Sequence, residues 1–256
     1  MHSNLIVLPF VLVLCCFKLC NTSKQTVNKV DNNFISIFDG KTLNNWKGDP
    51  KYWSVENGNL VGIVTPETIL KSNTFIIWQG GQPENFELKL EYKISESGNS
   101  GINYRSESLP NNPFALRGYQ CDIDGKNKYT GQNYEEKKRT TLAYMGEKVI
   151  IDTQSNPDAS GNLRTNVKKN CWQTRNVIET LGSKEVLKLK IKNEDWNQVH
   201  LIVNKNKLQH YVNGVLMSET IDNDTINKSL KGFIGVQVHV GPPMKVSYKN
   251  IQLKKL

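Results

Sequence analysis

The chain has 256 residues, of which 38% are hydrophobic and 9% aromatic, a composition typical of globular proteins and too apolar for a disordered one. Its formal net charge is +9, but the lysines alternate with apolar residues in stretches such as ELKLEYKI, as expected of a solvated sheet face. Because no basic cluster is interleaved with aromatic residues at a base-stacking spacing, we exclude nucleic acid as a partner.

The N-terminal segment has the composition of a targeting signal. Its first apolar run, LIVLPFVLVL, is of signal-peptide length and too short to span a bilayer, and the chain becomes polar directly after Cys20. A cysteine between an apolar run and a polar tether is the layout of a bacterial lipoprotein. We therefore expect a signal peptide over 1–20, a tether over 21–33 and a folded domain over 34–256, with Cys20 or Cys15 as the lipid anchor. The predicted location is the periplasm or outer membrane of a Gram-negative bacterium, with no membrane contact beyond that anchor.

Alternation of apolar and polar residues dominates the chain after residue 50. In 86–94 every second residue is apolar, which predicts a strand with one buried and one solvated face. Further segments predicted as strands from the same reasoning are 186–192, 199–204, 208–212, 233–240 and 245–253. Asn213 and Gly214 predict a tight hairpin turn, because both central residues of such a turn need positive φ. Short strands without a long helical stripe predict an all-β sandwich of two antiparallel sheets.

The middle of the chain, 125–175, is less regular and rich in Asn, Lys and Thr. We expect long connections there, and such connections often carry binding residues. The predicted domain has two cysteines. Cys121 lies just before this stretch, and Cys171 lies in it. In an oxidising compartment they would form one disulfide, and two free thiols are the alternative.

Common catalytic motifs are absent from the sequence, which has no HExxH, paired CxxC, GxSxG or phosphate-binding loop. Polar residues do stand in strand-like segments. They are Asn99, Asn103 and Arg105, then Tyr119, Asp122 and Asp124, and finally Gln237 and His239. Residues two apart share one face of a strand, so neighbouring strands of this kind would form a polar floor suited to a hydroxyl-rich ligand. Simple decoration of a solvated sheet face is the alternative.

Seven stretches resemble one known family, in the family's order. They read FISIFDGKTLNNWKG, WSVENGNLVG, NFELKLEYKI followed by GNSGINYRSE, GYQCDIDG, DWNQVHLIV, HYVNG and GFIGVQVHVGPPMKVSYKNIQLKKL. Together they span about residues 34 to 256 and are similar to the 3-keto-disaccharide hydrolase family, also called 3-keto-glucoside 1,2-lyase/hydratase. The resemblance implies a concanavalin A-like jelly roll, frequently secreted or lipid-anchored in bacteria that degrade glycans.

The resemblance also implies a reaction on a glycoside or oligosaccharide. A sugar-oxidising oxidoreductase first converts the 3-hydroxyl of the sugar to a ketone, which acidifies the proton on C2. A base removes that proton while the glycosidic oxygen leaves C1, and water then adds to the resulting 2-hydroxy-glucal to release free 3-keto-sugar. Such chemistry needs a base near C2, an electrophile over the ketone oxygen and an acid for the leaving group.

Residue roles follow from the resemblance as a hypothesis. His239 is the first candidate for base or metal ligand, because imidazole titrates near neutral pH. Asp122 and Asp124 are the next candidates for base, acid or metal ligation. Arg105 would stabilise the enolate, with a divalent metal ion as the competing electrophile. The residues expected to hold the substrate are Asn99, Asn103, Tyr119, Gln237 and Asp124.

One departure from the family pattern keeps other functions open. Many members read GYE where this chain reads GYQ, so Gln120 replaces a carboxylate, and either Asp122 takes over or the site is inactive. A non-catalytic carbohydrate-binding module on the same fold is the first alternative. The second is a conventional glycosidase, whose two carboxylates would lie roughly 5–10 Å apart.

Overall fold

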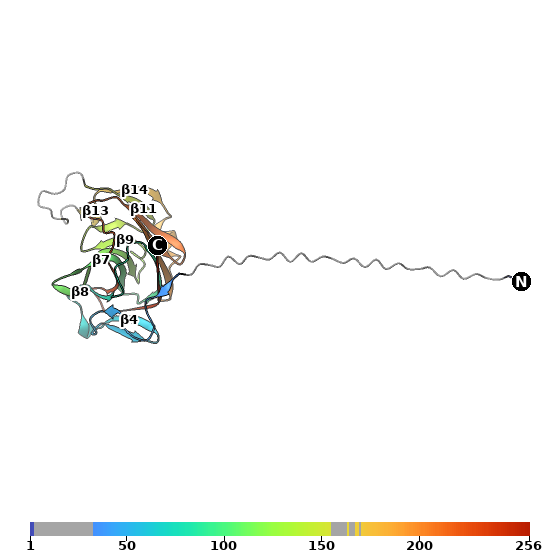
Figure 1. Ribbon diagram of the computed structural model, residues 1–256, viewed down its shortest axis with the longest axis horizontal. Helices are drawn as coiled ribbons and strands as arrows, with labels where there is room; N and C mark the ends of the chain where they lie inside the picture. The colour runs from blue at the N-terminus through green and yellow to red at the C-terminus, as the bar shows by residue number, and fades with distance from the viewer. Residues whose placement is uncertain (3–32, 155–162, 164–166, 169) are drawn as a thin grey trace. The chain divides into compact units, whose positions relative to one another are not determined.

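The alternating segment at 86–94 forms strand β6 (Phe86–Ile94), in which every second side chain is buried. The computed structural model of the chain describes residues 1–2, 33–154, 163, 167–168 and 170–256. Within it, Asn33–Leu256 is a compact unit built almost entirely of strands. Figure 1 shows these strands as two layers, in which β7, β8 and β9 lie side by side. The predicted all-β class is therefore confirmed.

The first sheet has ten strands. In spatial order they are β14 (Arg175–Thr180), β11 (Glu147–Ile151), β17 (Val215–Asp222), β16 (Lys207–Val212), β15 (Asn197–Asn204), β6, β19 (Met244–Lys255), β4 (Asn59–Val64) and β3 (Trp53–Glu56), with β1 (Ile35–Ser36) beside β19. All neighbours are antiparallel except β11 and β17, which run parallel. The predicted turn at Asn213 and Gly214 joins β16 to β17 with φ values of 49° and 78°.

The second sheet has nine strands. In spatial order they are β12 (Val167–Lys168), β13 (Cys171–Trp172), β10 (Thr140–Ala143), β9 (Asn133–Glu136), β8 (Asn112–Asp124), β7 (Asn99–Leu109), β18 (Phe233–Val238), β5 (Thr74–Trp78) and β2 (Trp46–Lys47). Its one parallel pair is β10 with β13. The prediction of two antiparallel sheets is thus confirmed apart from one parallel pair in each.

Apolar side chains from both sheets fill the space between the two layers. On β6 they include Leu88 and Leu90, and on β15 they include Val199 and Leu201, all at most 2% exposed. Each such side chain stabilises the fold by about 1.5–3 kcal/mol relative to an exposed one. The alternate residues of β6 face away from this core, which explains the lysines and glutamates between its apolar positions.

The prediction of a strand over 186–192 is wrong. It begins inside a short helix, α1 (Lys184–Lys188), and continues through turns. Ser183 caps the helix by accepting a hydrogen bond from the Val186 amide at 3.3 Å. The buried residues Leu187 and Ile191 lie four apart, which is the helical spacing, and the alternating pattern concealed it. A 3₁₀ turn, η1 (Pro66–Thr68), lies earlier in the chain.

Both cysteines of the domain are free, so the predicted disulfide between Cys121 and Cys171 is wrong. Cys121 lies on β8 and Cys171 on β13, with β9 and β10 between them. Three strand spacings of about 4.8 Å separate the two strands by roughly 14 Å, whereas the Cα atoms of a disulfide lie about 4.4–6.8 Å apart.

The predicted signal peptide over 1–20, with its anchor cysteines Cys20 and Cys15, lies outside the described residues except for Met1 and His2. The same holds for the tether over 21–33 up to Asn32. Within the described part of the chain, we find no helix with the length and hydrophobicity needed to cross a membrane.

Candidate active site

Polar side chains from four neighbouring strands share one face of the second sheet. Gly101 on β7 is opposite Asp122 on β8, and Gln120 on β8 is opposite Tyr134 on β9. Opposite residues point to the same side of a sheet, and so do residues two apart along a strand. His239 follows directly after β18, the neighbour of β7 on its other side. This face therefore carries the polar floor that the sequence predicted as one possibility.

A cavity of about 300 Å³ opens on this face. Amides, carboxyl groups and phenols dominate its lining, which consists of Asn73, Asn99, Gln120, Asp122, Tyr129, Gln132, Tyr134, Glu136, Lys137, Asn170 and His239. Three of the predicted site residues, Asn99, Asp122 and His239, thus meet at one pocket. Hydrogen-bond donors and acceptors on all sides suit a ligand rich in hydroxyl groups.

Curvature of the sheet encloses the pocket. The Nδ2 atom of Asn73, directly before β5, lies 3.3 Å from Oε1 of Glu136, at the end of β9. In the sheet order, β18, β7 and β8 stand between those two strands. Four strand spacings amount to roughly 19 Å in a flat sheet, more than two side chains can span. The two flanks of the sheet must therefore bend toward one another around the pocket.

Asp122 is the most perturbed carboxyl group that lines the pocket. It is 8% exposed, and burial raises its pKa from 3.8 to about 7, with a further rise from the nearby carboxyl group of Glu136. Two amides oppose this rise: Gln120 Nε2 donates to Oδ1 at 2.5 Å and Gln132 Nε2 donates to Oδ2 at 2.6 Å. The carboxyl group is consequently fixed in place and poised to exchange a proton near neutral pH.

The Gln120 side chain reaches Asp122 only because residue 101 is a glycine. A Cβ atom at Gly101 would lie 2.3 Å from Cδ of Gln120, far inside van der Waals contact. Behind the pocket wall, the fully buried Gln237 donates from Nε2 to Oε1 of Gln120 at 3.3 Å. Gln237, predicted to bind substrate, is therefore the outer link of an amide relay that ends on Asp122.

Glu136 is the second carboxyl group of the pocket. It is 7% exposed, and burial raises its pKa, while Lys137, Asn73, His239 and a hydrogen bond with Gln237 lower it. The Nζ atom of Lys137 lies 4.0 Å from its Oε1. The pocket thus holds two carboxyl groups in distinct settings, one bound by two amides and one beside cationic or polar neighbours, which is the usual basis for an acid and a base with separate roles.

Arg105 lies away from the pocket. Its guanidinium donates to the backbone carbonyls of Glu84, at 2.6 and 2.8 Å, and Lys205, at 2.7 Å. Arg105 has a φ of 45°, and the register of β7 against β8 shifts here, so a β-bulge interrupts the alternation that would have placed it on the same face as Asn103. Its expected role over a substrate ketone does not fit this position.

Three other predicted residues have internal partners instead of lining the cavity. Tyr119 points into the sandwich, where its hydroxyl donates to Asp222 at 2.6 Å and accepts from Arg139 at 3.3 Å. Asp124 accepts backbone amides of the turn after β8 at 2.7 to 3.0 Å. Asn103 is fully buried opposite Gln120 on β8, and its Nδ2 donates to Oγ of Ser106 at 3.4 Å. Their polarity serves the fold, which residue type and alternation alone could not reveal.

The sequence reasoning missed Glu136, Gln132 and Lys137. They lie in the stretch 125–175 that showed no regular alternation, although binding residues were expected somewhere in it. The Gly- and Asn-rich turn between β8 and β9 was the available signal, because a hairpin there brings 133–136 opposite 118–121.

A family model described as the 3-keto-alpha-glucoside-1,2-lyase-like domain matches residues 33–254, nearly the whole described unit. The chain belongs to this family. The resemblance inferred from the sequence motifs is thereby confirmed. The 3-keto-disaccharide hydrolase of Bacteroides thetaiotaomicron is 35% identical to this member over 85 residues, which are 30% of this chain and 29% of that protein. The match thus spans less than a third of that relative's length.

Solved structures support the fold of this family member. A presumed glycosyl hydrolase from Parabacteroides distasonis has a TM-score of 0.52 at 21% identity, covering 87% of this chain and 94% of that one. A Bacillus subtilis protein of unknown function with a galectin-like fold has a TM-score of 0.51 at 11% identity, covering 83% and 90% of the two chains. At these identities the likeness concerns the fold alone, and it agrees with the predicted jelly-roll sandwich.

The metal ion considered as an electrophile for this family does not fit the residues present. No three His, Cys, Asp or Glu side chains of the described ranges come together as a metal site. Each oxygen of Asp122 already accepts an amide N–H, an arrangement that serves an anion. His200 pairs with a glutamate on the first sheet and His210 is buried between the sheets, so neither joins His239.

Proposed function

We propose that this chain cleaves the glycosidic bond of 3-keto-glycosides by elimination across C1 and C2 followed by hydration. The observation that carries the proposal is the meeting of two buried carboxyl groups, Asp122 and Glu136, with the imidazole of His239 at one polar pocket. Membership of the family and the name of the Bacteroides relative support the same reaction class.

Asp122 is the proposed base. The 3-ketone lowers the pKa of the C2 proton, and a base with a pKa of about 7 is half ionised at neutral pH yet basic enough to accept that proton. The amides of Gln120 and Gln132 hold the carboxylate, so ionisation requires no rearrangement of its surroundings. His239, at the same pocket, is the alternative base.

Glu136 is the proposed acid for the leaving group. Its raised pKa favours the protonated form, which can donate a proton to the glycosidic oxygen as the C1–O bond breaks. The enolate oxygen formed at C3 needs a cation or N–H donors, and Lys137 replaces Arg105 in that role because it lines the cavity. In the hydration step, ionised Glu136 takes a proton from water as the hydroxyl group adds to C1, and protonated Asp122 returns its proton to C2.

The substrate requires an earlier oxidation, because an ordinary glycoside has a hydroxyl group at C3. We therefore retain a sugar-oxidising oxidoreductase as the partner that supplies the ketone. Export with a lipid anchor belongs to the same proposal. Cell fractionation of a Cys20→Ser variant beside a Cys15→Ser variant tests it, since replacement of the anchor cysteine alone would release the protein from the membrane.

The decisive assay uses a synthetic 3-keto-glucoside with a chromogenic leaving group, the unoxidised glucoside and an enzyme-free control for spontaneous elimination. We expect enzyme-dependent release from the keto substrate only. Asp122→Asn should lower kcat by about 10²–10⁴-fold, and Glu136→Gln should lower it for poor leaving groups most. Glu185→Gln, on the exposed surface of α1, is the matched control and should retain full activity.

The other outcomes distinguish the alternatives. Equal release from the unoxidised glucoside would identify a conventional two-carboxylate glycosidase. Release from neither substrate, with retained sugar binding that Asp122→Asn weakens, would identify a carbohydrate-binding module. A parallel assay with a chelator tests the metal, and full activity in chelator is the result expected from the donor set.

A further inference from the structure

The pocket residue Glu136 ends β9 and lies between two interior residues, Glu135 on the same strand and Arg139 after the following turn. Glu135 directly precedes Glu136, and successive side chains of a strand point to opposite faces. Glu135 is accordingly fully buried on the interior side, whereas Glu136 faces the pocket. The turn closes with a hydrogen bond from the Lys138 amide to the Glu135 carbonyl at 3.2 Å, and Lys137 has a φ of 56°. The interior and the pocket thus share one short segment of backbone.

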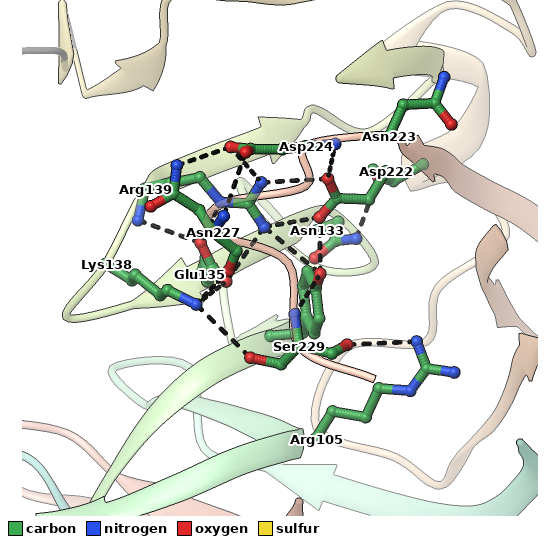
Figure 2. A network of polar contacts seen from close by, with 12 residues as sticks. Arg105, Asn133, Glu135, Lys138, Arg139, Asp222, Asn223, Asp224, Asn227 and Ser229 are labelled. Atoms are coloured by element: carbon green, nitrogen blue, oxygen red, sulfur yellow. Dashed lines mark hydrogen bonds and ion pairs between the residues drawn. The ribbon is translucent and has the colours of Figure 1, made fainter. Parts of the chain in front are cut away.

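The Glu135 carboxylate organises this turn. It accepts the backbone N–H of Arg139 at 3.2 Å and the Nε and Nη2 groups of the same residue at 2.5 and 3.2 Å. The Nζ atom of Lys138 lies 3.5 Å from it as well. Figure 2 shows the two cationic side chains converging on this carboxylate from the turn that follows it.

Arg139 ties the turn to the other sheet. The fully buried guanidinium forms ion pairs with Asp222, the last residue of β17, at 2.6 Å and with Asp224, two residues beyond it, at 3.3 Å. Three buried carboxylates therefore share this guanidinium, as Figure 2 shows. Because β17 belongs to the first sheet and β9 to the second, the guanidinium fixes the end of β9 against the opposite layer.

We propose that the Glu135–Arg139 pair is a positioning element that holds the Glu136 carboxyl group in the pocket wall. The expected effect on kcat rests on the proposed function, but the position of Glu136 can be measured without it. Loss of the pair would free the turn, let Glu136 move toward solvent and return its ionisation toward that of an ordinary glutamate. A displacement of about 1 Å is enough to cost on the order of 10²-fold in rate.

Arg105 provides a matched control. It is also buried, with 2% of its surface exposed. Its Nη1 donates to the Ser229 carbonyl, in the loop after β17, at 3.4 Å. Figure 2 shows it beside the network, with Ser229 as its contact there. None of its hydrogen bonds in the described part of the chain goes to the turn 135–139. A general loss of rigidity would therefore act equally through Arg105→Lys and Arg139→Lys.

The experiment titrates Glu136 by carbon-13 NMR of glutamate-labelled protein, with the signal assigned by its loss in Glu136→Gln. We compare Arg139→Lys, Glu135→Gln and Arg105→Lys with the unmodified chain, and record thermal midpoints and kcat on the keto substrate. The Glu136 titration midpoint should fall in the first two variants, with about 10²-fold lower kcat, and stay unchanged in Arg105→Lys.

An unchanged midpoint in folded Glu135→Gln or Arg139→Lys, or an equal shift in Arg105→Lys, would overturn the proposal. If Arg139→Lys does not fold, Glu135→Gln decides by the same criterion, because it weakens the pair while Arg139 keeps its ion pairs with Asp222 and Asp224. If the unmodified chain does not act on 3-keto-glycosides, only the kcat comparison is lost, and the titration still supports or overturns the positioning role.

Discussion

The Nε2 atom of Gln120 lies 2.5 Å from Oδ1 of Asp122, so an amide donates to the carboxylate at the centre of the pocket. The family pattern inferred from the sequence has a glutamate at the position of Gln120, which would set two carboxyl groups against one another. In this chain the second carboxyl group comes from Glu136 on the neighbouring strand. The Gln120 departure is thus compatible with a pocket that still holds an acid and a base.

Restoring the family residue with Gln120→Glu should shift activity to higher pH. The change replaces a donor that lowers the pKa of Asp122 with a like charge that raises it above its present value of about 7. Since the base must be ionised, the acidic limb of the pH–rate profile should move upward by about 1 unit or more. An unchanged limb would mean that Asp122 is not the base.

Gly101→Ala should disturb the pocket while the fold survives. The new Cβ would collide with the far end of the Gln120 side chain, which can move, and the φ of Gly101 lies outside the left-handed region. Displacement of Gln120 removes a hydrogen bond that lowers the pKa of Asp122, so the acidic limb should move upward here too. We expect a thermal midpoint close to that of the unmodified chain, whereas an unaltered pH profile would contradict the amide relay.

The free energy of unfolding should depend on pH through Asp122. Its pKa is raised from 3.8 to about 7 in the folded state, so its stabilising contribution is full below pH 3.8 and is lost as the pH rises through 7. The loss amounts to roughly 4 kcal/mol at most. Asp122→Asn removes it, so urea unfolding should show the variant gaining up to about 3 kcal/mol relative to the unmodified chain between pH 5 and pH 8. A constant difference would show that Asp122 ionises normally.

Differential alkylation with peptide mass spectrometry should find both domain cysteines as thiols. Burial raises the pKa of the Cys121 thiol well above its ordinary value. It also raises the pKa of the Cys171 thiol, which is only half-buried. Cys171 should therefore react in the native protein, though slowly, and Cys121 only after unfolding. A disulfide-linked peptide containing both residues would contradict the strand order of the second sheet.

The regular parts of the fold were predictable from the sequence because they rest on local rules. The alternation in 86–94 and the paired positive-φ residues Asn213 and Gly214 each act within a few residues of chain. The helix at Lys184–Lys188 was missed because a short stretch can satisfy both periods, and only the packing of Leu187 decides between them.

The site was predictable only in part, for a related reason. Asp122, His239 and Asn99 line one pocket, as one of the two interpretations of their spacing expected. Arg105 was misplaced because one bulge reverses the side to which a residue points. Glu136 was missed because the turn before β9 indicates only its strand, whereas its place in the pocket also depends on sheet curvature and on the interior network behind it.

The most direct test of the account is the rate of release from a chromogenic 3-keto-glucoside deuterated at C2, compared with the same substrate carrying hydrogen there. If Asp122 removes the C2 proton in the step that expels the leaving group, the deuterated substrate should react several-fold more slowly, and the rate with either substrate should fall in Asp122→Asn. Equal rates for the two substrates, with rapid release also from the unoxidised glucoside, would contradict elimination and assign the pocket to direct hydrolysis.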